Sequence, residues 1–267
     1  MVRMIFSDMD GTLLDDHGYV TDTNAQLIRD SGIPFTLVSA RAPMEMAEAI
    51  DRLALKGPQI GFNGGLIYER AGSGWRVLDQ APMAKADAER IIAAVSARFP
   101  NVSLSYYTVT DWYAARIDEG LRGEIAVSHQ APTLADYRTV FAQEDLAVLK
   151  IMLISFDPAE FARLKAFFAE AQFPGVSAQQ SGTAWFEITS LAAKKSRGID
   201  YVLRREGIDA ADAAAFGDGH NDLPMLNMVG TPIVMANALP EIKQVAKHLT
   251  AANTEDGVGH GIWRFLK

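Results

Sequence analysis

Four aspartates in two short clusters are the residues of this 267-residue chain best placed to do chemistry. Asp8 and Asp10 stand two residues apart directly after an apolar run, and at the end of a strand this spacing aims both carboxylates to the same side. Asp218 and Asp222 lie in a second polar stretch, GDGHND, which also follows an apolar run. Carboxylates gathered in one pocket repel one another unless a cation offsets their charge. The pattern therefore predicts a hard divalent ion with oxygen ligands, and Mg²⁺ is the usual ion where phosphate is also bound.

Short apolar runs that end in small or polar residues would position these aspartates. The runs cover residues 4–7, 35–39, 59–62, 213–216 and 232–235, and they predict strands buried on both faces. Segments with helical periodicity lie between them, at 21–30, 44–55 and 197–205, and Gly207 is expected to end the last helix. Alternating strands and helices predict an α/β fold, a Rossmann-like doubly wound parallel sheet, whose strands bind ligands beyond their carboxyl ends.

The middle of the chain has a different pattern. It predicts helices at 84–99 and 158–171 and strands at 102–107, 112–116, 148–156, 176–179 and 184–188. We expect this segment to form an inserted α+β domain over residues 82–187. The core would then be built from residues 1–81 and 188–267.

The motifs at the strand ends resemble those of the haloacid dehalogenase superfamily, and specifically its Cof-type phosphatases, which carry a class IIB cap. DMDGT resembles the first motif of that superfamily, LVSAR the second, Lys195 within AAKKSRGIDYVL the third, and GDGHND the fourth. The resemblance spans nearly the whole chain. It implies a magnesium-dependent phosphatase that hydrolyses phosphate monoesters of small metabolites, sugar phosphates foremost, with the insert as a cap that selects the substrate.

The resemblance also implies a role for each matching residue. Asp8 would attack phosphorus to give an aspartyl-phosphate, Asp10 would protonate the leaving oxygen and later activate water, and Lys195 would neutralise charge. The implied metal ligands are Asp8, Asp10 through its backbone carbonyl, Asp218, and Asp222 directly or through water. The implied contacts of the substrate phosphate are Ser39, Arg41, Asn63 and Asn221.

Several of these residues also have simpler explanations. Ser39 could satisfy the backbone at a strand end, Arg41 could pair with Glu45 one helical turn on, and Asn63 could only form a turn with the glycines after it. Lys194 is the reserve candidate for the third motif, because many relatives have glycine after the lysine and this chain has Ser196 after Lys195. His220 is expected to be a loop or substrate-facing side chain, since Mg²⁺ prefers oxygen ligands.

The composition narrows the possible partners. A formal net charge of -8 disfavours binding to nucleic acid or an anionic membrane, and the absence of cysteine excludes disulfides and thiolate chemistry. Charged residues within the first ten positions leave no apolar signal segment, which predicts a cytoplasmic protein. The oligomeric state stays open.

Parts of the pattern also occur in proteins with other functions. A phosphotransferase or phosphomutase of the same superfamily could pass the phosphoryl group to a sugar hydroxyl in place of water. A catalytically silent binding module would have no need for a nucleophile and a general acid in register. A dinucleotide oxidoreductase is disfavoured because no G-x-G-x-x-G follows the first predicted strand.

Overall fold

The computed structural model describes residues 1–267 apart from Ser73 and Gln172, and it divides the chain into two compact units. The first unit comprises Met1–Arg41, Met46–Gln80 and Lys194–Lys267, and the second comprises Ala42–Glu45 and Ala81–Ala193. The boundary expected between residues 187 and 188 falls inside strand β11 (Trp185–Ser190), which pairs with strands of the second unit along its length. The division therefore comes after Ala193, where that strand has ended.

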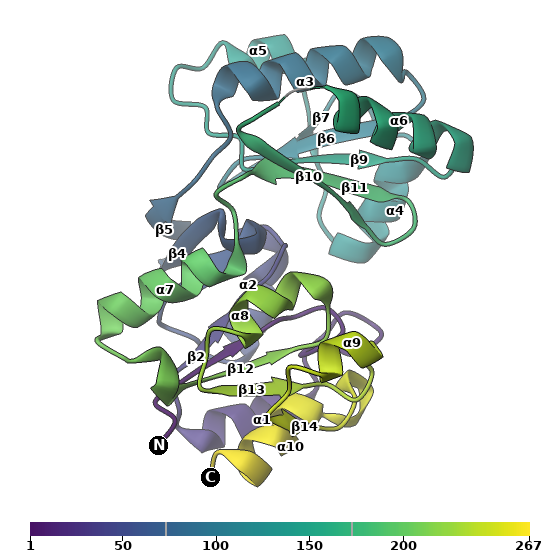
Figure 1. Cartoon of the computed structure of the whole chain (residues 1–267). Helices are drawn as coiled ribbons and strands as arrows, with labels where there is room; N and C mark the ends of the chain where they lie inside the picture. Colours follow the sequence, from purple (N-terminus) through teal and green to yellow (C-terminus); the bar gives the residue numbers. More distant parts are fainter. Residues whose placement is uncertain (73, 172) are drawn as a thin grey trace. The chain divides into compact units, whose positions relative to one another are not determined.

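The first unit holds both chain termini (Figure 1). Its amino-terminal part contains β1 (Met4–Ser7), α1 (Asp22–Ser31), β2 (Phe35–Leu37), α2 (Pro43–Arg52) from Met46 on, β3 (Gln59–Gly61), β4 (Leu66–Ala71) and β5 (Gly74–Gln80). Its carboxyl-terminal part contains α7 (Lys195–Glu206), β12 (Ala213–Gly217), α8 (Leu223–Leu226), β13 (Thr231–Val234), α9 (Pro240–Lys243), β14 (His248–Leu249) and α10 (Gly257–Phe265). Gly207 ends α7 in the left-handed conformation, as the sequence predicted.

A five-stranded parallel sheet in the order β14-β13-β12-β1-β2 forms the centre of the first unit. Its strands are short, and all except the edge strand β14 are almost fully buried, because helices cover both faces. Apolar side chains of α7, α8 and α9 pack on the face that carries Phe6 and Ala215, while α10 packs against Phe216 on the other face and against α1 (Figure 1). This architecture confirms the predicted doubly wound α/β fold.

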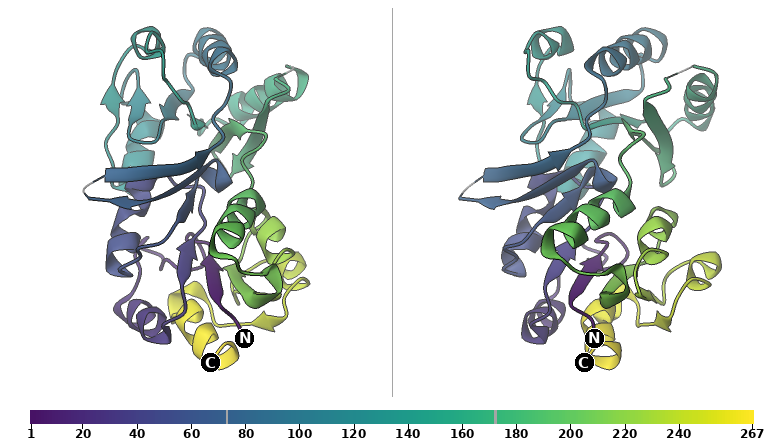
Figure 2. Two further views of the ribbon diagram at one scale, coloured as in Figure 1. Left: turned by 90° about the vertical axis from the view of Figure 1, so that its left-hand side faces the viewer. Right: turned by 60° about the vertical axis from the view of Figure 1, so that its left-hand side comes forward.

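The third predicted strand, β3, belongs to a separate antiparallel sheet, although the alternation of strands and helices predicted a parallel one. β3 is joined to the parallel sheet by an isolated bridge between Val38 and Ile60, and it pairs antiparallel with β4 in a three-stranded sheet of order β3-β4-β5. The reason is local, since β4 follows β3 after a short turn that reverses the chain, and antiparallel partners need no longer connection. Figure 2 shows β4 and β5 as a long two-stranded ribbon.

The second unit is an α+β structure with its own core. Its elements are α3 (Lys85–Arg98), β6 (Ser103–Tyr107), β7 (Trp112–Ala114), α4 (Glu119–Ser128), β8 (Thr133–Leu134), α5 (Tyr137–Phe141), β9 (Lys150–Ile154), α6 (Pro158–Glu170), β10 (Val176–Ser181) and β11. The strands form a six-stranded sheet in the order β10-β11-β9-β6-β7-β8. Side chains of α3, α5 and α6 share one apolar core with one face of this sheet, and α4 contacts the other face at Ser103 and Ile154. No helix among the described residues has the length and apolar character to cross a membrane.

Candidate active site

The candidate site lies at the carboxyl ends of the central strands of the first unit. Asp8 directly follows β1, Ser39 lies two residues beyond β2, and Asp218 directly follows β12. Because β12, β1 and β2 are adjacent and parallel, these residues meet at one edge of the sheet. The site is therefore built from segments more than 170 residues apart in the sequence, as the motif spacing predicted.

A buried lysine connects two of the aspartates. Lys195 Nζ donates to Asp8 Oδ1 at 2.5 Å and to Asp222 Oδ1 at 2.7 Å, and only 1 % of the lysine side chain is exposed. Lys195 is the first residue of α7, whereas Lys194 is the exposed residue that precedes the helix. The structure thus brings Lys195, and not the reserve candidate Lys194, to the carboxylates.

The charges of this network are unbalanced. Burial raises the pKa of Asp8 well above its ordinary value, the charge of Asp222 raises it further, and Lys195 acts in the opposite direction. Burial would lower the pKa of Lys195, but the two carboxylates outweigh burial and raise that pKa. The lysine is therefore cationic, and a single ammonium group faces two buried carboxylates.

Asp222 is held by its own loop as well as by the lysine. Its Oδ2 accepts from the backbone N–H groups of Asp218 and Gly219, both at 2.9 Å, and its side chain is fully buried. Both carboxylate oxygens are thus engaged by donors in this structure. Asp222 fixes the loop after β12 and the position of the lysine ammonium.

Asp218, at the start of the loop after β12, is held by residues of the DMDGT motif. Its Oδ1 accepts from Thr12 Oγ1 at 2.6 Å, and burial raises the pKa of Asp218. Gly11 has a φ of +73°, and a Cβ atom on it would lie 2.5 Å from Asp218 Oδ2. In the DMDGT motif, Gly11 therefore leaves space for the Asp218 side chain, and Thr12 orients it through a hydrogen bond.

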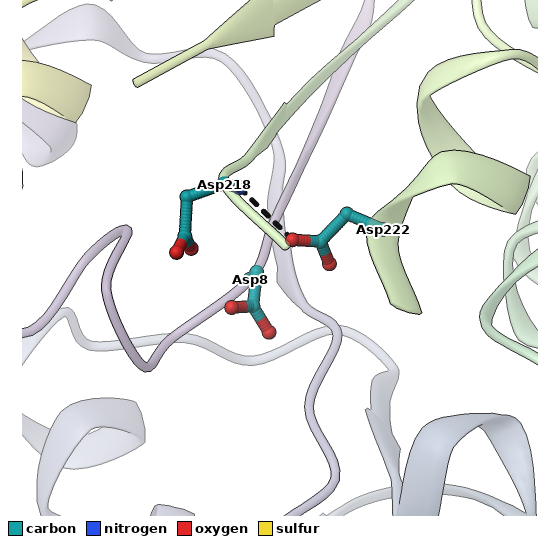
Figure 3. Close-up of side chains that lie close together, drawn as sticks. All are labelled: Asp8, Asp218 and Asp222. Atoms are coloured by element: carbon teal, nitrogen blue, oxygen red, sulfur yellow. Dashed lines mark hydrogen bonds between the residues drawn. The ribbon is translucent and has the colours of Figure 1, made fainter. Parts of the chain in front are cut away.

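The carboxylates of Asp8, Asp218 and Asp222 form one group whose candidate ligand atoms lie within 4.8 Å of one another. Figure 3 shows the three side chains close together, with the hydrogen bond from the Asp218 backbone to Asp222 dashed. Three carboxylates against one lysine leave negative charge in excess, and all candidate donors are oxygen atoms. This donor set fits a hard divalent cation such as Mg²⁺.

The fourth aspartate has a separate partner. Asp10 accepts from Arg41 in a bidentate pair, with Oδ2 to Nε at 3.0 Å and Oδ1 to Nη2 at 2.6 Å. The Asp10 side chain is 58 % exposed, and that of Arg41 is 14 % exposed. For Arg41 the sequence suggested either a substrate contact or a pair with Glu45, and it did not suggest a pair with Asp10. The bidentate pair holds the Asp10 carboxylate in a defined orientation.

The remaining predicted phosphate contacts lie around a strained turn. Phe62, Asn63 and Gly64 have φ values of +50°, +53° and +91°, and a left-handed non-glycine residue costs on the order of 1–3 kcal/mol. The Asn63 N–H donates to the Ser39 carbonyl at 2.8 Å, and Asn221 Nδ2 lies 3.5 Å from Asn63 Oδ1. The structure thus brings Ser39, Asn63 and Asn221 to one side of the site.

The Ser39 side chain satisfies the backbone, as its simpler explanation proposed. Its Oγ accepts from the Arg41 N–H at 3.1 Å and is fully buried. His220 is exposed, and its Nε2 lies 3.5 Å from Glu241 Oε1. His220 is thus engaged outside the carboxylate cluster.

Two contributors to the site were missed by sequence reasoning. Asn237, just beyond β13, donates through Nδ2 to the Gly11 carbonyl at 2.7 Å and so supports the DMDGT loop. Arg197, two residues after Lys195, donates through Nη1 to the Gly64 carbonyl at 2.7 Å. A lone asparagine after a strand does not indicate a site residue in the sequence. An arginine two residues after the motif lysine is a recognisable candidate for a contact near the site.

Over nearly its whole length, the chain is similar to known phosphatases in sequence and to a known hydrolase in fold. A bacterial relative, 5-amino-6-(5-phospho-D-ribitylamino)uracil phosphatase YitU of Bacillus subtilis, is 24% identical over 99% of this chain and 96% of its own length. HMP-PP phosphatase of Yersinia pseudotuberculosis is 25% identical over 100% of this chain and 96% of its own length. The crystal structure of a haloacid dehalogenase-like hydrolase from Bacteroides thetaiotaomicron superposes with a TM-score of 0.89 at 21% identity, covering 99% of each chain. The sequence model of the haloacid dehalogenase-like hydrolases matches residues 5–262, and the chain therefore belongs to that family.

Proposed function

We propose that this protein is a magnesium-dependent phosphatase that hydrolyses phosphate monoesters of small metabolites through an aspartyl-phosphate on Asp8. The observation that carries the proposal is the buried contact of Asp8 with Lys195, beside two further carboxylates at the carboxyl edge of a parallel sheet. A lysine buried against an aspartate keeps its charge and can neutralise an anion that arrives at that carboxylate.

The proposed reaction divides hydrolysis into two displacements at phosphorus. In the first, an Asp8 oxygen bonds to phosphorus, the bond from phosphorus to the ester oxygen breaks, and Asp10 gives its proton to the leaving oxygen. In the second, Asp10 takes a proton from water as the water oxygen bonds to phosphorus, and the bond from phosphorus to Asp8 breaks. Inorganic phosphate leaves, and both aspartates return to their starting states.

The surrounding residues would prepare these two steps. Lys195 would hold the Asp8 carboxylate in place and offset charge on the phosphoryl group. Arg41 would orient Asp10 in its ionised form, which takes the proton of water in the second step, because both Asp10 oxygens accept from the guanidinium. Backbone and side chains near Ser39, Asn63 and Asn221 would hydrogen-bond the phosphoryl oxygens. This orientation role for Arg41 is one that the sequence did not suggest.

A magnesium ion would be held by Asp8, the Asp10 carbonyl and Asp218, with Asp222 acting directly or through water. When bound, the ion supplies positive charge that polarises the phosphoryl group and offsets the repulsion between the carboxylates. The excess of carboxylates over basic groups at Asp8, Asp218 and Asp222 supports this assignment.

We assign substrate selection to the second unit as a cap domain, and sugar phosphates as the foremost substrate class. The name of the YitU relative describes a phosphorylated ribityl chain, which is a sugar-alcohol phosphate and supports this class. The inserted unit has a sheet and an apolar core of its own, so its surface can vary without disturbing the chemistry of the first unit.

Phosphate release from p-nitrophenyl phosphate and a panel of sugar phosphates tests the proposal. Turnover should require Mg²⁺, stop with EDTA, and be absent from Asp8→Asn. Phosphate release by Asp8→Asn at the wild-type rate would refute the nucleophile. Absence of hydrolysis by folded, magnesium-loaded wild type, with transfer to an added sugar acceptor instead, would favour a phosphotransferase.

A further inference from the structure

Arg197 connects two parts of the candidate site that the family motifs treat separately. One part is the strained turn at residues 62–64, which carries Asn63, and the other is the first turn of α7, which carries Lys195. Because residues two apart on a helix point to different sides, Lys195 can reach the carboxylates while Arg197 reaches the turn. The first turn of α7 thus contacts both the carboxylates and the strained turn.

The contacts of Arg197 are specific in geometry. Nη1 donates to the Gly64 carbonyl at 2.7 Å, and Nη2 donates to Asp79 Oδ2 at 2.5 Å. Asp79 lies on β5, in register with Ile67 of β4, the strand that leaves the turn. The guanidinium therefore bridges the strained turn to the hairpin that follows it.

The turn and the helix also touch directly. A Cβ atom on Gly64 would lie 2.0 Å from the Lys194 carbonyl oxygen, so the turn packs against the backbone that begins α7 with no room for a side chain. On its other side, the Asn63 N–H is bound to the Ser39 carbonyl. A shift of the turn would therefore move Asn63 and the start of α7 together.

We infer that Arg197 is a positioning residue that fixes the Asn63 turn against the helix bearing Lys195, and that it supports phosphoryl transfer without touching the substrate. The inference rests on the proposed phosphatase function of this site. A simpler explanation is that Arg197 and Asp79 form a surface ion pair that contributes to folding alone, since their side chains are 26 % and 40 % exposed. The two explanations differ in what they predict for kinetics at equal folded fraction.

The test compares Arg197→Ala with Arg70→Ala as a matched control. Arg70 pairs with Asp51 at 3.0 Å in the same unit and has similar exposure, but its partner lies on α2 rather than on the site. With both variants fully folded by circular dichroism, Arg197→Ala should lower kcat/KM for p-nitrophenyl phosphate by about 10- to 100-fold, as misplacements of about 1 Å do. Arg70→Ala should stay within about twofold of wild type, because the residues that Arg70 contacts, Asp51 and Trp75, are not part of the site.

A double-mutant cycle with Asn63→Ala identifies the route of the effect. If Arg197 acts through the turn, the loss from Asn63→Ala should be smaller in the Arg197→Ala background than in wild type. Asp79→Asn should act in the same direction with a smaller loss, and it provides a milder variant if Arg197→Ala does not fold. Independent, multiplicative losses, or equal kcat/KM for the Arg197 and Arg70 variants, would overturn the inference.

Amide hydrogen exchange over residues 62–65 separates this inference from the proposed function. The amides of Asn63 and Gly65 should exchange faster in Arg197→Ala than in Arg70→Ala, because their acceptors belong to the turn and its support. If wild type releases no phosphate, the proposed function fails while faster exchange still supports the positioning role. Equal exchange in the two variants would overturn that role whatever the activity.

Discussion

Replacing Lys195 with methionine tests the electrostatic argument most sharply. Methionine has a similar length and no charge, so Lys195→Met leaves the carboxylates of Asp8 and Asp222 buried without their cation. Removing one partner of a buried ion pair costs about 3–5 kcal/mol of unfolding free energy. The rate should fall about 10²- to 10³-fold, the usual loss for one charge-stabilising donor.

The pH dependence of this variant has a defined sign. Lys195 is the group that lowers the pKa of Asp8, so the pKa of Asp8 in the folded variant should rise further above its unfolded value. A raised carboxyl pKa makes ionisation unfavourable in the folded state, and this cost is lost as the pH falls through the folded pKa. The stability gap to wild type should therefore be large at about pH 8 and smaller at about pH 5.5.

Urea unfolding of metal-free protein at both pH values measures this gap, and Lys194→Met is the matched control. Lys194 is the exposed neighbour, so its substitution should change the unfolding free energy by less than about 0.5 kcal/mol. If Lys195→Met were as stable as Lys194→Met at the higher pH, or retained wild-type kcat/KM, the reasoning about the buried network would be refuted.

Three further perturbations address the metal site and the general acid. Mg²⁺ affinity should weaken as the pH falls from about 8 to about 5.5, because burial raises the pKa of both Asp8 and Asp218 and their protons must leave before the cation binds. Calorimetry in buffers of different ionisation enthalpy should detect the released protons, and a pH-independent affinity would contradict this expectation. Gly11→Ala should weaken Mg²⁺ binding about tenfold or more and destabilise the fold by about 1–3 kcal/mol, because its Cβ would meet Asp218 at a backbone position with positive φ; an unchanged Mg²⁺ titration would count against the assignment. Arg41→Ala should lower kcat about 10- to 100-fold with little change in KM if it orients Asp10, whereas a raised KM at unchanged kcat would identify Arg41 as a substrate contact.

The central sheet could be predicted from sequence because its strands are buried on both faces. Residues 4–7 form β1 with the predicted bounds, and the other four apolar runs contain β2 and β3 and most of β12 and β13. Near-continuous apolar runs of this length are typical of strands in a parallel sheet that is covered on both faces. The pairing of β3 was not predicted, because it depends on the reversal of the chain at residues 62–64 and not on the strand's own residues.

The carboxyl-terminal helix shows where propensity misleads. Residues 257–265 contain three glycines, which disfavour a helix, and no helix was predicted there. The structure explains all three by close packing. A Cβ on Gly257 would lie 2.2 Å from the Ala251 carbonyl oxygen. A Cβ on Gly259 would lie 2.8 Å from Leu27 Cδ1 of α1, and one on Gly261 would lie 2.7 Å from Phe216 Cε1 of the sheet. Tertiary packing thus requires residues that local preference rejects.

In the site, motif spacing predicted which groups gather but not how they pair. Asp8, Asp218 and Asp222 meet because parallel strands share one carboxyl edge, which sequence patterns can indicate. The contacts of Arg41 and Arg197 join residues 31 to 133 positions apart. Their side chains are long and have many rotamers, so only the folded backbone decides which partner each one reaches.

The covalent state of Asp8 during turnover is the most direct test of the proposed mechanism. Magnesium-loaded wild type should be mixed with substrate, quenched in acid within one turnover, digested and mapped by mass spectrometry. One phosphoryl group on the peptide that contains Asp8, absent from Asp8→Asn and lost on treatment with hydroxylamine, is the predicted result. Phosphate release by the wild type with no phosphorylated peptide at any quench time, together with release by Asp8→Asn, would contradict the central claim.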